Sequence, residues 1–256
     1  MENNGELKKA VNKIKNQSLK YLNNTYHWAE ASSAILSTSK SKSILVPSLS
    51  KKTQKTISKE LPRHTSEINA LSNNVYSSAF VSMVANAEWF LAELIRLILQ
   101  YKNNLIIAPI KNEQDEKDIT IPVSKIIKET TKEIIDELIE SRLASLFYAG
   151  PKIQKKYVCE HLGLNIEEEN WNDWIEYKAR RDLIVHSNSK VNNIYLSKCG
   201  ENAKYKKDDI VSFDKNEFAN SFLFIKKFVT RICANAIKTY NIISEKAYLK
   251  MNIKTE

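Results

Sequence analysis

Arg181, Asp182 and His186 form a compact set of residues that could cleave RNA without a metal ion. If residues 169–187 are helical, Asp182 and His186 lie four residues apart on one face, so the carboxylate can orient one nitrogen of the imidazole. The histidine can take a proton from a ribose 2′-hydroxyl or give one to a leaving 5′-oxygen. An arginine stays charged near neutral pH, so the expected role of Arg181 is to hold the scissile phosphate while negative charge builds in the transition state.

The spacing of the arginine and the histidine predicts how they would act together. At 100° per residue, Arg181 points about 140° away from His186, so one helix does not easily aim both side chains at one phosphate. Two copies that meet across a two-fold axis could do so. We therefore expect a site that is completed by a homodimer.

The other residues of this helix leave structural alternatives open. Its apolar residues share the side of the histidine, which places His186 along an apolar stripe: Trp171, Ile175 and Ala179. One alternative is a core histidine satisfied by Asp182. Trp171 and Trp174 could stack on bases, but at helical spacing they are more typical of a core. Arg180 could pair with Glu176 one turn away or supply a second phosphate contact.

The run R-D-x3-H at 181–186 resembles the signature of the HEPN superfamily (higher eukaryotes and prokaryotes nucleotide-binding), R-x4-6-H with Asn, Asp or His usually after the arginine. Glu176-x3-Arg180-Arg181 precedes it. Residues 187–196 are similar to the continuation H-N-x-G-x-V-N-x-x-Y-L of many HEPN nucleases, from which Ser187 and Ser189 depart. The resemblance covers roughly residues 66 to 246, and its specific part is about twenty residues long.

This resemblance implies an RNA endonuclease of the toxin or phage-defence type. It implies a homodimer whose motif helices face each other, and 2′-OH attack that leaves a 2′,3′-cyclic phosphate and a 5′-OH. Arg181, Asp182 and His186 would be catalytic, and we expect Arg180, Asn188 and Lys190 to contact the substrate. The alternative is a non-catalytic HEPN nucleotide-binding or dimerisation module.

Control by an antitoxin or a defence-system partner protein is a further hypothesis. Some HEPN toxins are silenced by modification of a tyrosine two residues after the motif histidine. Asn188 stands at that place here, so the resemblance does not extend to this mode of control.

Composition sets the frame for the motif. The chain has 256 residues, 43% of them hydrophobic, and only four Gly and five Pro, which favours long helices over a turn-rich β fold. The net charge of +9 fits a polyanionic partner such as RNA, although a lysine-rich composition typical of an AT-rich genome explains it equally well. The three cysteines indicate neither a disulfide framework nor a zinc site, so we expect reduced thiols in the cytoplasm, no metal and no cofactor: Cys159, Cys199 and Cys233.

Neither a targeting segment nor a membrane span is expected from the sequence. The chain begins with polar residues, and the most apolar stretch, 79–99, is interrupted by charged residues such as Glu88, Glu93 and Arg96. We therefore expect that stretch to be a buried central helix.

The predicted fold is all-α, an up-and-down HEPN-like helical bundle with a small β insert after the motif helix. We divide it into an N-terminal helix and a basic Ser/Lys-rich arm over 1–65, and a HEPN-like helical domain over 66–256. Helices are expected over 6–22, 65–101, 123–148, 151–162, 169–187 and 215–246, with Asn170 or a neighbour capping the motif helix and short strands at 194–197 and 209–213. The lysines between Lys40 and Lys59 belong either to a solvated linker or to a strap that guides substrate.

Overall fold

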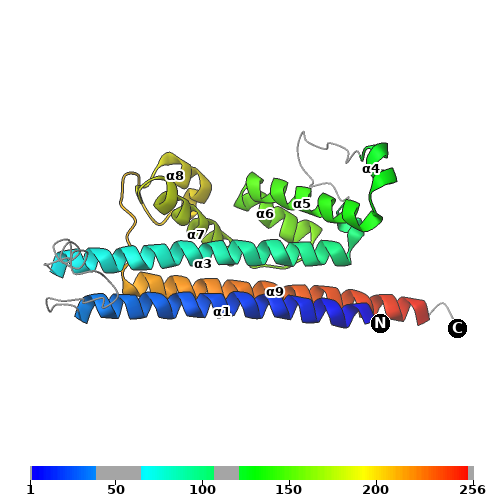
Figure 1. The fold of residues 1–256 in the computed structure, drawn as a ribbon, viewed down its shortest axis with the longest axis horizontal. Coiled ribbons are helices and arrows are strands. Elements are labelled where there is room, and N and C mark those ends of the chain that lie inside the picture. The colour runs from blue at the N-terminus through cyan, green and yellow to red at the C-terminus, as the bar shows by residue number, and fades with distance from the viewer. Residues whose placement is uncertain (1, 39–64, 107–120, 253–256) are drawn as a thin grey trace, which may run out of the picture.

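The computed structural model describes residues 2–38, 65–106 and 121–252. Three long helices make one elongated bundle: α1 (Glu2–Thr38), α3 (Thr65–Tyr101) and α9 (Lys215–Asn252) (Figure 1). α3 spans the range that its apolar periodicity predicts, and α9 packs against it as expected. The basic arm over 39–64 lies outside the described residues, so the predicted role of its lysines stays a prediction.

α1 belongs to the same core as α3 and α9. Val11, Leu22 and Ala29 of α1 are buried, with 1% of their surface exposed at most. Across the contact with α3, the Ser18 hydroxyl donates to the side-chain oxygen of Asn86 (2.6 Å). The ring of Tyr26 stacks on Phe222 of α9, with 4.4 Å between the ring centroids. The helical core therefore begins with α1, and the boundary expected at residue 65 does not divide it.

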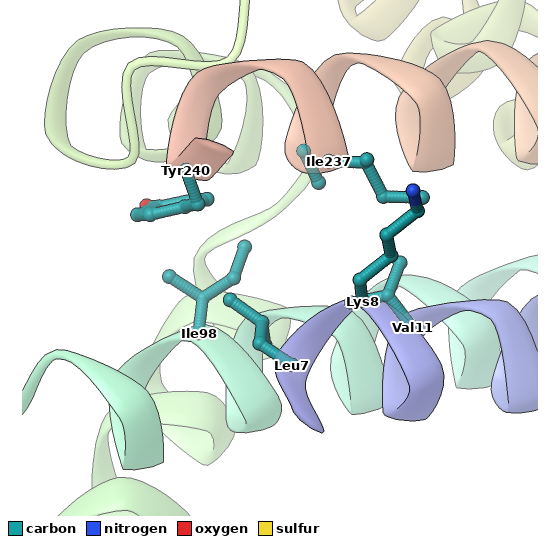
Figure 2. A pocket seen from close by; sticks show the side chains of 7 residues that line it. Leu7, Lys8, Val11, Ile98, Ile237 and Tyr240 are labelled. Carbon is teal, nitrogen blue, oxygen red and sulfur yellow. The ribbon is translucent and has the colours of Figure 1, made fainter. Parts of the chain in front are cut away.

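The interior of this bundle is closely packed. Figure 2 shows a cavity between α1, α3 and α9, lined by residues that include Leu7, Ile98 and Tyr240. Its volume is about 10 Å³. A cavity of that size holds one water molecule at most, so it is not a ligand site.

Shorter helices form a second layer along one side of α3 (Figure 1). Their bounds are η1 (Asn103–Leu105), α4 (Val123–Lys128), α5 (Thr131–Ala149), α6 (Pro151–Lys156), the π-helical turn η2 (Tyr157–His161), α7 (Glu168–His186), α8 (Asn193–Cys199) and η3 (Gly200–Asn202). The helix expected over 123–148 is divided, because Thr130 and Glu133 form a capping box that starts α5 anew. Gly150, with φ 93°, and Pro151 separate α5 from α6.

Three local predictions are wrong. Residues 194–197 lie within α8 and not in a strand, because the Asn192 side chain accepts the Tyr195 backbone N–H (3.0 Å) and starts a helix there. Residues 209–213 contribute one isolated antiparallel bridge, between Ile210 and Lys190. Asn170 lies inside α7 and does not cap it, since the N-cap residue is Glu167 and its side chain makes no capping hydrogen bond.

α3 is long and apolar enough, by length and composition, to cross a membrane over Asn69–Tyr101. Half of its most apolar window is buried inside the protein. α3 packs against α1, α5, α7 and α9, which is the setting of the central helix of a bundle. This packing agrees with the expected buried central helix.

Candidate functional site

Two tryptophans fix the motif helix α7 in the core. Trp171 and Trp174 are fully buried. The indole N–H of Trp171 donates to the backbone oxygen of Pro151 (3.0 Å), and the ring of Trp174 stacks on Phe228 of α9 at 4.8 Å. The core interpretation of these tryptophans is therefore confirmed, and neither ring has a face free to stack on a base.

Arg180 is enclosed and holds three parts of the molecule together. Its guanidinium donates to Glu176 one turn earlier (2.6 Å) and to Glu217 at the start of α9. Arg180 has no exposed surface. Four aromatic rings surround its guanidinium carbon at 4.8 to 5.7 Å: Phe80, Tyr177, Tyr205 and Phe213. The prediction that Arg180 contacts substrate is wrong for this conformation, because a phosphate cannot reach it.

The Glu176 carboxylate also connects α8 to α7. Tyr195 donates its hydroxyl to Glu176 (2.9 Å) and accepts the backbone N–H of Lys204 (3.1 Å). Burial and the neighbouring Glu176 carboxylate raise the pKa of the Tyr195 hydroxyl. Burial opposes the charge of Arg180, but the Glu176 and Glu217 carboxylates more than offset it, so the pKa of this guanidinium lies above its usual range. Glu176 thus accepts from both α7 and α8 in a buried network.

Arg181 belongs to a second network, which reaches the surface. It donates to Glu88 of α3 and to Asp182 (2.9 Å). The other oxygen of Glu88 pairs with Lys178 (2.7 Å), and the other oxygen of Asp182 pairs with Lys198 of α8 (2.9 Å). Three cations and two carboxylates therefore alternate from α3 through α7 to α8, with one positive charge in excess. The Arg181 side chain keeps 23% of its surface exposed, whereas Arg180 has none.

His186 is the last residue of α7 and is exposed. Within the described part of the chain, its imidazole makes no hydrogen bond. Both oxygens of Asp182 are engaged by Arg181 and Lys198, so the expected Asp182–His186 hydrogen bond is not formed. The apolar stripe through Ala179, which is 2% exposed, ends before the histidine. His186 is therefore neither a core histidine nor one held in place by Asp182.

The turn after His186 presents the two remaining predicted site residues. The backbone N–H groups of Ser187 and Ser189 both donate to the Leu183 oxygen (2.9 and 3.0 Å), which closes the end of α7. Asn188 and Ser189 have φ 47° and 62°, the left-handed region, and the HEPN-like pattern has glycine at the position of Ser189. Asn188 is exposed. The Lys190 ammonium lies 2.9 Å from Asp208, and this contact lowers the pKa of the Asp208 carboxyl.

Asn188 and Lys190 are thus open to a ligand, in contrast to Arg180. The Lys190 and Asp208 side chains keep 57% and 62% of their surface exposed, so their ion pair is a weak restraint. A phosphate could displace Asp208 from Lys190 at little cost. The structure therefore leaves two of the three expected substrate contacts available beside His186.

No described part of the chain gathers three or more His, Cys, Asp or Glu side chains in a group that could hold a metal ion. Cys199 and Cys233 are buried. Burial raises the pKa of the Cys199 thiol to about 11. We therefore assign no described residue to a metal or cofactor.

The ion network contains three residues that the motif did not indicate: Glu88, Lys178 and Lys198. Glu88 lies 93 positions before Arg181, so no local pattern connects the two residues. A signal was present nonetheless, because a carboxylate inside the most apolar stretch of the chain requires a buried or half-buried cation as its partner. Lys178 lies one turn before Arg181 on α7, is only 8% exposed, and carries no signal of its own.

Comparison with protein-family models, curated proteins and solved structures found no match for this chain. The HEPN resemblance therefore depends on residues 176–196. Several of these residues have a structural part: Val191 is buried, Asn192 caps α8, and Tyr195 and Arg180 both bind Glu176. These parts of the pattern build the support, and Arg181 and His186 lie at the surface beside it.

Proposed function

We propose that the chain is a metal-independent RNA endonuclease whose active site is the end of α7, with Arg181 and His186 as its reacting groups. The observation that carries this proposal is the difference between two adjacent arginines. Arg180 is enclosed, whereas the Arg181 side chain keeps 23% of its surface exposed. Both carboxylates that Arg181 contacts hold a second cation, so the guanidinium can turn to a phosphate without leaving an unpaired charge behind.

The chemistry follows from these groups. The imidazole of His186 takes the proton of a ribose 2′-hydroxyl, the 2′-oxygen forms a bond to phosphorus, and the bond from phosphorus to the 5′-oxygen breaks. The 5′-oxygen leaves as a hydroxyl after receiving a proton from an imidazolium. Arg181 balances the extra negative charge on the phosphate oxygens while both bonds are partly formed. The products are a 2′,3′-cyclic phosphate and a 5′-OH.

A second copy of the chain completes this site. Arg181 and His186 diverge by about 140° along α7, so the acid, the base and the arginine do not converge within one copy. Val185 and Ile194, beside the histidine and on α8, expose 49% and 65% of their surface. Apolar side chains that stay exposed next to a polar site are typical of an interface, which supports a dimer formed by this end of the molecule.

The test is cleavage of a labelled RNA by the purified chain in EDTA, with the product ends identified by mass spectrometry. His186→Ala should lower the single-turnover rate at least a hundredfold, since general acid–base catalysis typically contributes 10² to 10⁴. The matched control is His27→Ala, which removes an exposed histidine from α1; with the chain in saturating excess over the RNA, it should leave the single-turnover rate unchanged. Equal rates for wild type and His186→Ala, or activity that depends on added magnesium, would refute the proposal.

A non-catalytic HEPN module is the second candidate, and one observation favours it. Asp182 engages Arg181 and Lys198 and leaves the imidazole of His186 without an orienting carboxylate. In an active enzyme, Asp182 then acts through Arg181, and Asp182→Asn should cost about tenfold, as is typical of a positioning residue. A chain that binds RNA but leaves it intact in wild type and all variants would be the module.

By the HEPN resemblance, we place this activity in toxin–antitoxin or phage-defence systems, under the control of a partner protein. Expression of the chain in bacteria should then slow growth, and His186→Ala should abolish this effect. Equal growth with both chains would separate the nuclease proposal from the toxin proposal.

A further inference from the structure

The positive charge of the chain is unevenly distributed over the fold. Residues 5–36 of α1 and 215–240 of α9 carry ten Lys or Arg residues and three carboxylates, Glu6, Glu30 and Glu217. The whole chain has 39 basic and 30 acidic residues, and α5 has two basic and four acidic residues. A lysine-rich composition alone would raise the charge of all helices. The bias therefore belongs to the layer of α1 and α9.

The outer face of α1 carries a row of lysines. Lys9, Lys13 and Lys20 follow one another at helical spacing on the same side of α1, and all three are exposed. At 1.5 Å per residue, the row is about 16 Å long. In the described part of the chain, none of the three forms an ion pair. Four lysines and the side-chain amides of Asn12, Asn16 and Gln17 line this open face.

This face is separate from the candidate active site. α1 packs against α3 and α9, whereas α7 packs against α3 from the second layer (Figure 1). The apolar side of α1 is used in the core, through Val11 and Leu22, so it is not available to enter a membrane. A partner of this face must therefore bind to lysine ammonium groups and side-chain amides.

Two aromatic residues lie beside the row, about 80–100° around α1 from Lys20. Tyr21 directly follows Lys20 and contacts Ser82 of α3 through its hydroxyl (2.5 Å), and Trp28 lies about 12 Å beyond Lys20 along α1. They expose 45% and 53% of their surface. Lysines that neutralise phosphates, together with exposed rings on which bases can stack, are the combination found in proteins that bind single strands.

We propose that the outer face of α1, defined by Lys9, Lys13, Lys20 and Trp28, binds single-stranded nucleic acid through its phosphate backbone. This inference goes beyond the proposed endonuclease, because the binding does not require the end of α7. RNA and DNA share the phosphates and the base faces, so the sugar is decided by the test. Double-stranded nucleic acid hides its base faces from Trp28 and should bind more weakly.

The test compares two triple variants of the full chain that have the same net charge. Lys9→Gln, Lys13→Gln and Lys20→Gln remove the row, and Lys128→Gln, Lys132→Gln and Lys152→Gln remove three exposed lysines from α4, α5 and α6. The ligands are labelled 20-mers of 2′-O-methyl RNA, single-stranded DNA and duplex DNA. These ligands resist 2′-OH attack, so binding is measured whether or not the chain cleaves RNA.

Loss of the α1 row should weaken single-strand binding at least tenfold at 0.1 M salt and reduce the slope of log K against log salt by about 2. The second triple variant should bind within twofold of wild type. Trp28→Ala should weaken binding about tenfold with an unchanged salt slope, whereas Trp89→Ala, at an exposed tryptophan of α3, should have no effect. Equal losses in both triple variants, unchanged binding without the row, or duplex binding as tight as single-strand binding would overturn the proposal.

Discussion

Replacing each of the two adjacent arginines of α7 by methionine should separate structure from function. Methionine keeps the aliphatic stem of the side chain and removes the charge. Arg180→Met removes the only guanidinium in a buried site, and Arg181→Met removes one member of a half-exposed network. Both substitutions replace arginine by methionine at neighbouring positions, so a difference in their effects on stability or activity comes from the different surroundings of the two side chains.

The expected magnitudes follow from the partners that remain. Without Arg180, Glu176 stays 1% exposed with Lys204 at 3.9 Å as its nearest cation, and Glu217 loses its partner. Breaking a buried pair in this way costs about 3–5 kcal/mol of unfolding free energy. Without Arg181, Glu88 keeps Lys178 and Asp182 keeps Lys198. That loss should cost about 1 kcal/mol or less, as for other partly exposed pairs.

Thermal unfolding and RNA cleavage together provide the assay. At about 2–4 °C per kcal/mol for a chain of this size, Arg180→Met should lower Tm by roughly 6–20 °C, and Arg181→Met by no more than about 4 °C. Below its Tm, Arg180→Met should cleave RNA within tenfold of the wild-type rate. Arg181→Met should remain folded and lose cleavage at least a hundredfold, because it removes charge stabilisation made in the transition state.

Either of two results would refute this reasoning. If Arg180→Met unfolds at the wild-type temperature and is inactive, the buried arginine would be the reacting group, and the conformation seen here would have to open for catalysis. If Arg181→Met lowers Tm as much as is expected for Arg180→Met, Lys178 and Lys198 do not compensate the charges of Glu88 and Asp182. Circular dichroism at 20 °C distinguishes a folded inactive chain from an unfolded one.

Two further predictions concern alkaline stability and the dimer. Burial raises the pKa of Cys199 to about 11 and that of Tyr177 to about 12. Both groups therefore ionise at lower pH in the unfolded chain, so the unfolded chain is increasingly favoured as pH rises from about 9 through those values. Tm should fall between pH 8 and pH 10.5, and a constant Tm would contradict this. Ile194→Asp should dissociate the dimer in sedimentation and lower cleavage in parallel, while Leu223→Asp, at an exposed residue of α9, should do neither. A monomeric Ile194→Asp that cleaves at the wild-type rate would exclude a composite site.

The long helices could be predicted from the sequence because apolar residues repeat over many turns. α3 matches its expected range of 65–101, and α9 begins at the expected Lys215. α1 runs to Thr38, whereas the predicted helix ends at residue 22. The prediction ended early because polar residues such as Asn23 and Asn24 interrupt the apolar pattern, although Ala29 continues the buried side of the helix. The strand expected at 194–197 failed for a local reason: Ile194 and Tyr195 favour strands, but Asn192 caps a helix before them.

The site could be predicted only in part. Helical spacing correctly predicts the pair of Glu176 and Arg180, but it says nothing of Glu88, which reaches Arg181 from another helix. It also does not distinguish Arg180 from Arg181, since three of the four aromatic rings that enclose Arg180 come from α3 and from the segment between η3 and α9. Tertiary packing, which no local pattern describes, decides which arginine is buried.

Two carboxylates at the same spacing show why spacing alone does not establish a contact. Glu176 and Asp182 each have a basic residue four positions later, and only Glu176 pairs with it. Glu176 is buried and has a permanent cation, Arg180, on its own face. Asp182 is 25% exposed, and two permanent cations, Arg181 and Lys198, already engage both of its oxygens. Arg181 of the motif itself and Lys198 of α8 thus compete with His186 for Asp182, and spacing along α7 reveals neither contact.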